Sequence, residues 1–166
     1  MTAHVNIRIQ EADFDIAQEI AALTKGRSDI GAVVTFTGIC RGDEGGAPLL
    51  AMTLEHYPDM AEAEIARHVA AAERRWPLHG VAVIHRYGRL QPGEDIVLVV
   101  TAAAHRQDAF AAAEFLMDYL KTRAPFWKQI ELAGGGRTDK IWVEAKRSDD
   151  ALADRWTPSS GRRAAE

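Results

Sequence analysis

The stretch Asp118–Lys128 reads Asp-Tyr-Leu-Lys-Thr-Arg-Ala-Pro-Phe-Trp-Lys and joins the end of a long helix to the start of a strand. Pro125 makes the break, because proline lacks the N–H that continues a helix and pushes the preceding residue out of the helical region. Phe126 and Trp127 then begin the strand. The cations that gather at this helix-to-strand corner are Lys121, Arg123 and Lys128.

Two interpretations of these cations stay open from the pattern alone. A helix C-terminus attracts positive charge, so the cations can simply cap a surface helix. Alternatively, Lys121 borders the core, because it lies about 20° around the helix from Phe110 and about 40° from Met117. These two residues belong to an expected apolar stripe of Phe110, Ala113, Met117 and Leu120. A lysine at the rim of a core can hold an anion or exchange a proton.

Apolar periodicity predicts the other elements on both sides of the corner. Strands are expected at Val5–Ile9, Gly31–Arg41 (well buried), Leu49–Tyr57, Val81–Leu90, Asp95–Ala104, Phe126–Leu132 and Lys140–Ala145. Helices are expected from a cap at Asp13 to just before Gly26, from Asp59 to Trp76, from Gln107 to Arg123 and over Asp149–Trp156. The expected connections are a mobile loop at Gly42–Pro48, a type II turn at Gln91–Glu94 and a hairpin turn at Gly134–Gly136.

The order of these elements predicts an α+β fold, because helices follow hairpins instead of alternating strictly with single strands. The sheet is therefore expected to be mixed or antiparallel. A chain of 166 residues without a repeat or a linker fits one domain. We place this domain at residues 1–156 and expect a disordered tail at residues 157–166.

Composition and charge narrow the class of protein. Apolar residues make up 47% of the chain, so a packed core is expected. The net charge of −4 argues against a nucleic-acid binder and makes the cations at the corner a local feature, suited to a small anionic ligand. A single cysteine, no signal peptide and no long apolar window predict a cytoplasmic protein that does not enter a membrane.

The histidines do not form a metal-binding pattern. None of the 6 histidines are paired at the one-turn helical spacing of zinc sites, and there is no Cys-x-x-Cys, so no metal site is expected. We expect His68 and His79 to be in solvent. His56 and His85 lie on strands, where a histidine is usually a satisfied core or rim residue.

Other candidate residues lie at strand ends and helix ends. Cys40 precedes Arg41, which can lower the pKa of a thiol, but a small buried residue is the favoured interpretation. His105 and Arg106 lie where a strand gives way to a helix, and helix N-termini bind anions unless Asp108 merely caps the helix. Strand ends and helix ends can converge in space. The cations that would then line one pocket are Arg41, His105, Arg106, Lys121 and Lys128.

These residues coincide with the pattern of a known family. The chain resembles the large, catalytic subunit of molybdopterin synthase from about residue 30 to Trp156. The resemblance is most specific in the corner at 118–128. It also rests on Gly-Ala-Val-Val-Thr-Phe-Thr-Gly (31–38) with Arg41, Leu-Glu-His-Tyr-Pro (54–58), Arg-Trp-Pro-Leu (75–78), Val-Ile-His-Arg (83–86), Ala-His-Arg (104–106) and Trp-Val-Glu-Ala (142–145).

The resemblance implies an α/β hammerhead fold with an additional small antiparallel β-sheet. It also implies a homodimer in which each protomer binds a small ubiquitin-like sulfur-carrier subunit, giving a heterotetramer. The thiocarboxylate at the C-terminus of the carrier then supplies sulfur to cyclic pyranopterin monophosphate, which becomes the dithiolene of molybdopterin. No cofactor, metal, nucleic acid or membrane is expected to take part in this reaction.

By the same resemblance, Lys121 and Lys128 are the catalytic residues, with Lys121 near the carrier terminus and Lys128 transferring a proton. The implied substrate-binding residues are Ile39, Cys40, Arg41, His105, Arg106, Lys121, Lys128, Gln129 and Ile130. His105 and Arg106 would form an anion site contributed across the dimer. Ile39 departs from the family, because many relatives have a lysine there, and Cys40 belongs to the pocket wall and not to the chemistry.

The chemistry of the substrates supports this assignment independently. A phosphate and a thiocarboxylate are both anions, so a cluster of cations reduces their repulsion, and lysine can also exchange a proton. The main alternative is a non-catalytic scaffold that binds a ubiquitin-like partner, which would not need five cations. A basic nucleic-acid module conflicts with the net charge of −4.

Overall fold

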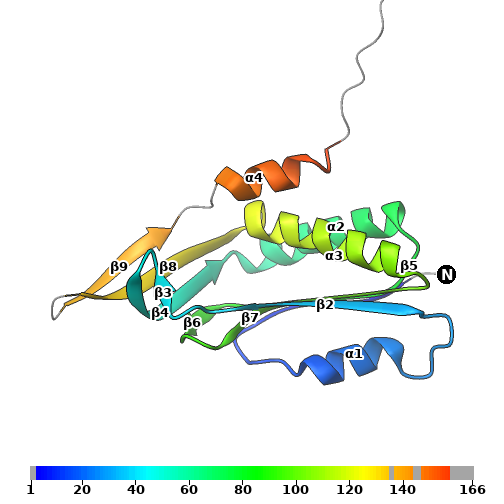
Figure 1. The fold of residues 1–166 in the computed structure, drawn as a ribbon, viewed down its shortest axis with the longest axis horizontal. Helices are drawn as coiled ribbons and strands as arrows, with labels where there is room; N and C mark the ends of the chain where they lie inside the picture. Colours follow the sequence, from blue (N-terminus) through cyan, green and yellow to red (C-terminus); the bar gives the residue numbers. More distant parts are fainter. Residues whose placement is uncertain (1–2, 135–136, 144–146, 158–166) are drawn as a thin grey trace, which may run out of the picture.

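Helices and strands follow each other in the expected α+β order, in a computed structural model that describes residues 3–134, 137–143 and 147–157 (Figure 1). The helices are α1 (Ile16–Thr24), α2 (Pro58–Arg75), α3 (Arg106–Thr122) and α4 (Arg147–Asp154). The strands are β1 (His4–Gln10), β2 (Ala32–Ile39), β3 (Asp43–Glu44), β4 (Ala47–His56), β5 (Leu78–Arg86), β6 (Gly88–Leu90), β7 (Asp95–Ala103), β8 (Phe126–Gly134) and β9 (Arg137–Val143).

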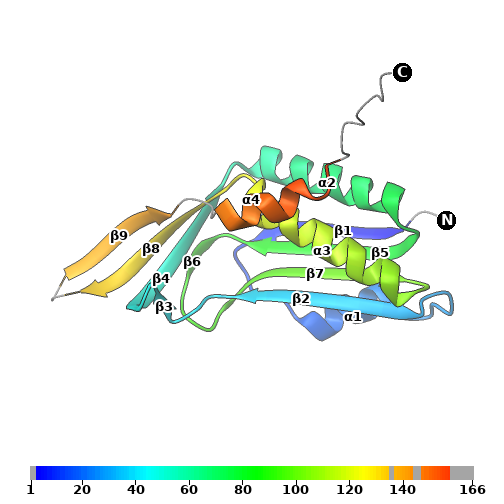
Figure 2. The same cartoon turned by 45° about the horizontal axis from the view of Figure 1, so that its top comes forward.

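The first sheet has the order β1-β5-β7-β2 within the described residues. β1 runs parallel to β5, whereas β5 and β2 both run antiparallel to β7, which confirms the predicted mixed sheet. Nearly every residue of β5 and β7 is buried, because helices cover both faces of this sheet (Figure 2).

The two faces of the first sheet carry separate cores. On the face covered by α2 and α3, Val81, Val83 and Val99 pack against Ile65 and Leu116. On the other face, Ile84 and Leu98 pack against α1. Alternate residues of one strand therefore enter different cores, as the two-residue period of a strand requires.

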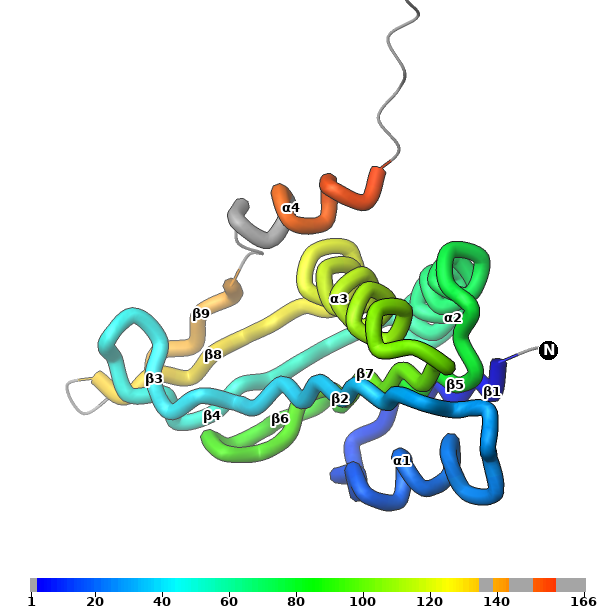
Figure 3. The backbone as a smooth tube through the Cα atoms, turned by 45° about the vertical axis from the view of Figure 1, so that its right-hand side comes forward, coloured from blue at the N-terminus to red at the C-terminus, as the bar shows by residue number. Residues whose placement is uncertain are grey.

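The second sheet has the order β3-β4-β8-β9 in the described part of the chain, and β6 also pairs with β4. All of these pairs are antiparallel, so this is the expected small antiparallel sheet of the α/β hammerhead fold. Figure 3 shows that it extends away from α1, α2 and the first sheet. Its own small core contains Cys40, Met52, Leu54, Leu90 and Ile130.

The predicted strand Val81–Leu90 is two strands that belong to different sheets. β5 pairs with β7 in the first sheet, whereas β6 pairs with β4 in the second. The chain changes sheet at Gly88, whose φ of 87° is one that glycine adopts readily. The predicted type II turn is confirmed, because Gly93 has a φ of 91° and the Glu94 N–H donates to the Gln91 carbonyl at 3.1 Å.

The predicted loop at Gly42–Pro48 contains a hairpin. Asp43 and Glu44 of β3 pair with Pro48 and Ala47. Gly45 and Gly46 form the turn with φ values of 61° and 85°, the two positive values that a type I′ turn needs. The glycine pair was therefore a hairpin signal, which the interpretation of this stretch as a loop missed.

Two predictions about burial are wrong. The side chain of Phe110 is 61% exposed, because α3 presents its alanines to the sheet and so turns Phe110 outward. β2 is not well buried, since it forms an edge of the first sheet and exposes Val33, Phe36 and Ile39. An edge strand has a neighbour on one side, so its β-branched composition did not predict its burial.

Helix α1 begins later than expected. Asp15 is its cap, and its side chain accepts a hydrogen bond from the Gln18 N–H at 3.0 Å. Asp13 instead accepts from the adjacent Phe14 N–H. Both aspartates can cap a helix, and the extended conformation of Asp15 decides which one does.

Helix α4 confirms the expected short C-terminal helix and docks on α3 through Asp118. One carboxylate oxygen of Asp118 accepts hydrogen bonds from the Arg155 side chain at 2.7 Å and from the Trp156 indole N–H at 2.7 Å. The first residue of the corner stretch thus anchors a segment far along the chain. The glycine pair Gly135–Gly136, the predicted strand end at 144–145 and tail residues 158–166 lie outside the described residues.

Candidate active site

The helix-to-strand corner forms where the sequence predicts it. The two lysines lie on either side of this corner, one at the end of α3 and the other on β8. Lys121 lies exposed in the last turn of α3, and the helix ends at Thr122. The Phe126 N–H donates to the Ala124 carbonyl at 2.7 Å as β8 begins. Lys128 is half-buried on β8, between Leu54 of β4 and β9.

Lys128 faces the core of the second sheet. Strand alternation places it on the same face of β8 as Ile130, which packs against Cys40. Lys128 and Cys40 also interact electrostatically. Burial and the charge of Glu94 raise the pKa of the Cys40 thiol, and the positive charge of Lys128 lowers it by a smaller amount. The thiol is 1% exposed and stays protonated at neutral pH, which agrees with a buried small residue and not with a nucleophile.

Lys121 lies near a stack of buried aromatic rings. The imidazole of His85 stacks on Phe126 with ring centroids 3.8 Å apart. Burial, with smaller contributions from the nearby charges of His56 and Lys121, lowers the pKa of His85 to about 4, although a hydrogen bond to the Arg86 carbonyl acts in the opposite direction. His85 is therefore neutral at pH 7, and Lys121 borders an uncharged surface. This confirms His85 as a satisfied core histidine.

The loop that carries Cys40 and Arg41 is held by Glu94. The Cys40 N–H donates to the Glu94 carbonyl at 2.9 Å, and the Glu94 carboxylate accepts from the buried Arg86 at 3.3 Å. Arg86 also donates to the carbonyl of Asp95. Arg86 thus positions the loop, a role that sequence reasoning missed because a strand-end arginine gives no local signal of its partners.

Arg41 itself points into solvent. Its guanidinium pairs with Glu44 of the β3–β4 hairpin at 3.3 Å, and two thirds of its side chain is exposed. An exposed ion pair of this kind contributes little to stability, so a ligand anion can replace Glu44 at small cost. The neighbouring Ile39 side chain is also exposed.

Other predicted substrate contacts do not reach the corner within one chain. His105 and Arg106 are exposed at the N-terminal end of α3, about 22 Å from Lys121 by the rise of an α-helix. One chain therefore does not gather all five cations in one pocket, an arrangement that the sequence left open. Asp108 does not cap α3, because His105 occupies the cap position without a side-chain hydrogen bond.

Gln129 and Ile130 follow Lys128 on β8, but neither side chain is placed to contact a ligand that binds beside Lys128. Gln129 lies on the opposite face of the strand, where it pairs with Trp142 of β9. Ile130 is only 3% exposed, so its side chain belongs to the core of the second sheet. Contacts from these two residues to a ligand beside Lys128 would have to come from their backbone.

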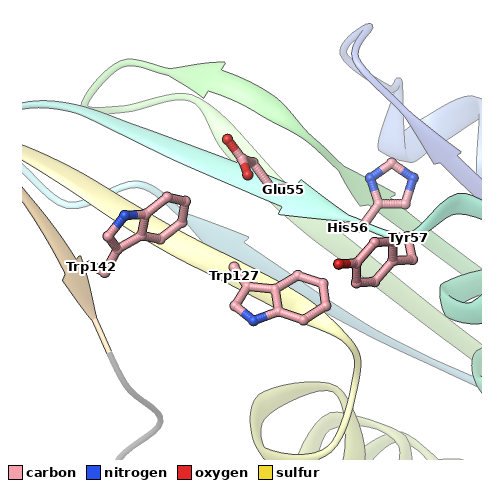
Figure 4. Close-up of a pocket in the computed structure, with 5 residues that line it drawn as sticks. All are labelled: Glu55, His56, Tyr57, Trp127 and Trp142. Carbon is pink, nitrogen blue, oxygen red and sulfur yellow. The ribbon is translucent and has the colours of Figure 1, made fainter.

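An aromatic pocket that sequence reasoning did not identify lies on the second sheet. It has a volume of about 300 Å³ and is lined by Glu55, His56, Tyr57, Trp127 and Trp142 (Figure 4). Tyr57 meets Trp127 edge to face at a centroid distance of 5.0 Å. Trp127 and Trp142 lie on the face of the sheet opposite Lys128. Exposed aromatic residues on paired strands were the signal for this pocket.

The histidines expected in solvent have partners. His68 is half-buried, and its ring stacks on Tyr119 at a centroid distance of 3.3 Å. His79 lies 2.9 Å from Asp29, which also pairs with Arg27. Both predictions are therefore wrong, because they ignored packing between distant elements. In the described part of the chain, no group of three His, Cys, Asp or Glu side chains could hold a metal ion.

The described residues contain no helix that is both long and apolar enough to cross a membrane. The two sheets and the helices that cover them place the chain in the class of α+β proteins with the α/β hammerhead architecture.

Comparisons with known proteins are consistent with this class. A sequence profile of the family described as "MoaE protein" matches residues 9–123. The chain is 60% identical over 154 residues to a molybdopterin synthase catalytic subunit of Mesorhizobium japonicum, covering 93% of this chain and 94% of that protein. A MoaE protein structure from Burkholderia ambifaria aligns with a TM-score of 0.76 at 47% identity, over 92% of this chain and 97% of that one. A molybdopterin synthase structure from Staphylococcus aureus aligns with a TM-score of 0.73 at 28% identity, over 82% of this chain and 95% of that one.

The chain belongs to the MoaE protein family, the family of molybdopterin synthase catalytic subunits. The resemblance noted from the sequence is thereby confirmed.

Proposed function

We propose that the chain transfers sulfur from the C-terminal thiocarboxylate of a small ubiquitin-like carrier subunit to cyclic pyranopterin monophosphate, forming the dithiolene of molybdopterin. The observation that carries this proposal is the placement of Lys121 and Lys128 on either side of one corner, with Lys121 near the neutral His85 and Lys128 near Cys40, which precedes Arg41. The single free cysteine, Cys40, is buried and fits a cytoplasmic location.

The two lysines have different surroundings, which favours different roles. Lys121 is exposed in the last turn of α3, where it can meet the incoming C-terminus of the carrier and neutralise its charge. Lys128 is half-buried against the second core, and burial makes an ammonium group a better proton donor. We therefore assign carrier binding to Lys121 and proton transfer to Lys128.

A homodimer would complete the site. β2 is an edge strand with exposed apolar side chains, and such an edge needs a cover. If two copies pair antiparallel through this edge, Ala32 of one copy lies near Ile39 of the other. Ala32 already pairs with Ala103, just before His105. The His105–Arg106 pair of one copy would then approach the Arg41 loop of the second.

This shared site can be tested by mixing two inactive variants. Dimers of His105→Ala chains and dimers of Lys128→Ala chains should each lack dithiolene formation with a thiocarboxylated carrier and the pyranopterin. After subunit exchange, about half of the dimers are mixed and contain one intact site of two, so about a quarter of the activity should return. No recovery in a mixture shown to contain mixed dimers would contradict a site that His105 of one copy and Lys128 of the other share.

The substrate side of the site has its own prediction. Arg41→Ala and Arg106→Ala should weaken binding of the phosphate-bearing pterin roughly ten- to a hundredfold, because each removes a charge-assisted hydrogen bond of about 1.5–3 kcal/mol. Carrier affinity should change much less, since a protein partner has a wider surface than its tail. Equal losses for both ligands, measured by titration calorimetry, would show that these arginines do not form a substrate anion site.

The alternative function is a non-catalytic scaffold for a ubiquitin-like partner. The aromatic pocket around Trp127 and Trp142 favours partner binding of some kind, because exposed aromatic residues are enriched at interfaces. A scaffold would bind the thiocarboxylated carrier without consuming it. Release of carboxylate-terminated carrier together with dithiolene product separates the two functions, since only the enzyme yields both.

A further inference from the structure

A second pocket lies where α2, α3 and α4 meet, on the helical layer and away from the second sheet. It has a volume of about 240 Å³. Its charged wall consists of Arg67, Arg74 and Arg75 from α2 and Arg123 from the end of α3. We call it the arginine pocket. None of its residues is among those assigned above to the reaction.

The arginine pocket carries an excess of positive charge. Arg67 pairs with Glu64 at 2.8 Å, and Arg123 pairs with Asp154 at 2.8 Å. Among the side chains that the structure describes, neither Arg74 nor Arg75 has a carboxylate partner, so this described wall carries two more guanidinium groups than carboxylates. Such an excess in a concave site favours an anionic occupant.

The guanidinium of Arg75 is held in place by packing. It donates to the Trp156 carbonyl at 2.9 Å and lies over the Phe115 ring, 4.7 Å from its centroid. The Trp156 side chain is fixed in turn by its hydrogen bond to Asp118. The wall that Trp156, just after α4, adds to the pocket is therefore ordered before any ligand binds, which reduces the entropy lost on binding.

The hydroxyl group of Tyr119 independently indicates that the pocket lacks a hydrogen-bonding ligand. Its side chain is 4% exposed, and its buried hydroxyl makes no hydrogen bond among the described residues. Leaving such a group unpaired costs about 1–3 kcal/mol, so most buried hydroxyls have a partner. Burial also raises the pKa of Tyr119, which keeps the hydroxyl a donor at neutral pH. The stacked His68 is itself fixed by a 2.8 Å hydrogen bond to the Glu64 carbonyl.

We propose that the arginine pocket binds a small phosphate-bearing anion, with Arg74 and Arg75 supplying charge and the Tyr119 hydroxyl supplying a hydrogen bond. A phosphate group fits better than a carboxylate, because its two negative charges match the two unbalanced guanidinium groups and its oxygens suit their planar forks. The pocket is larger than a phosphate ion, so a phosphate carried on a larger group also fits.

This site is separate from the lysine corner although both involve the end of α3. Tyr119 and Lys121 lie about 200° apart around the helix, so they point to opposite sides. The arginine pocket therefore binds its ligand independently of sulfur transfer, and its test needs no enzyme activity.

The test uses the full chain carrying Arg41→Ala and Lys128→Ala, which weakens anion binding at the corner. Inorganic phosphate, adenosine monophosphate and adenosine are titrated separately by calorimetry. We expect saturable binding of the monophosphate and none of adenosine. Phosphate binding as tight as the monophosphate would mean that the anion alone is recognised, whereas tighter monophosphate binding would mean that the rest of the nucleotide also contacts the pocket. Equal binding of adenosine, or no binding of either anion, would overturn the proposal.

Substitutions in the pocket locate the binding. Tyr119→Phe removes the hydroxyl alone, so monophosphate affinity should fall about tenfold while the melting temperature stays the same or rises. Arg74→Ala should weaken binding by a similar factor. Lys25→Ala is the control, because Lys25 is an exposed cation at the end of α1, on the other side of the first sheet. Unchanged affinity in both pocket variants would place the anion elsewhere and refute the site.

Discussion

The first sheet and the second sheet are built from the same kinds of residue but differ in how they are covered. In the first, β5 and β7 lie between α1 on one face and α2 with α3 on the other, and both strands are almost fully buried. In the second, one face covers a small core, whereas the other face exposes Trp127 and Trp142. Burial on two faces builds a rigid platform, and burial on one face leaves side chains free for ligands.

Most of the candidate functional residues lie on the second sheet, which is covered on one face only. Lys128, the Arg41 loop and the aromatic pocket all belong to the second sheet or its border, and the first sheet contributes the helix that carries Lys121. Residues on a half-covered sheet can be substituted with little loss of stability, whereas substitution of the buried residues of the first sheet destabilises the protein. Four experiments test whether the first sheet mainly determines stability and the second sheet mainly carries functional residues.

The largest effect should come from truncating the same residue type in each sheet. Ile84→Ala should lower the free energy of unfolding by about 2–5 kcal/mol, because Ile84 is fully buried in the platform. Ile141→Ala should cost less than about 1 kcal/mol, since that side chain is 46% exposed on β9. Urea denaturation measures both values. Similar losses would mean that the two sheets share one cooperative core.

The lysines should show the opposite pattern, with large changes in activity and small ones in stability. Lys128→Ala and Lys121→Ala should each lower dithiolene formation on the order of a hundredfold, while the melting temperature barely moves. Lys128→Arg should stay nearly as inactive, because arginine does not release its proton at working pH, and Lys121→Arg should be partly rescued.

Lys140 on β9 provides the control for these variants. It is an exposed lysine of the same sheet, 3.9 Å from Glu131, so Lys140→Ala should leave the activity near its original level. Lys121→Ala and Lys128→Ala could instead both keep nearly full activity, with folding and carrier binding intact. The lysines would then have no catalytic role and would only stabilise the end of α3.

His85, at the border of the two sheets, should make stability depend on pH. Its pKa is about 4 in the folded protein and near 6.5 when unfolded, so the unfolded state binds more protons between these values. Its contribution is complete above pH 6.5 and falls as the pH drops towards 4. We expect a loss of about 2 kcal/mol between pH 7 and pH 5. His85→Phe should remove this part of the pH dependence, as measured by denaturation at both pH values, and an unchanged slope would contradict it.

The smallest effect concerns the link between the sheets. Gly88→Ala should cost about 1 kcal/mol, because alanine is strained at the φ of 87° with which the chain leaves the first sheet. Gly42→Ala should be nearly neutral, since Gly42 has no positive φ and no atom lies within 4 Å of an added Cβ. Equal stability of the two variants would show that the crossing does not depend on glycine.

Sequence reasoning succeeded where neighbours along the chain control the outcome. Pro125 predicted the corner, the proline–glycine pair before Glu94 predicted the turn, and the apolar period predicted α2 and α3. The lysines at the corner and the burial of Cys40 were also found this way. The resemblance to the family added the hammerhead fold and the second sheet, which periodicity alone did not define.

Sequence reasoning failed where distant segments meet. It treated β5 and β6 as one strand, placed His68 in solvent and assigned Phe110 to the core. It also left open the convergence of His105 with the lysines, which the length of α3 excludes within one chain. Each of these outcomes depends on which surfaces pack together, and no local pattern records that.

The sequence by itself therefore determined the helices, the turns and the corner at Pro125, because steric limits on the backbone and hydrogen bonds act within a few residues. The tertiary structure alone decided that Asp118 would anchor α4, that Arg86 would hold the Arg41 loop, and that the two sheets would be covered so differently. These contacts join residues far apart in the chain, and they exist only because burying apolar surface brings the elements that carry them together.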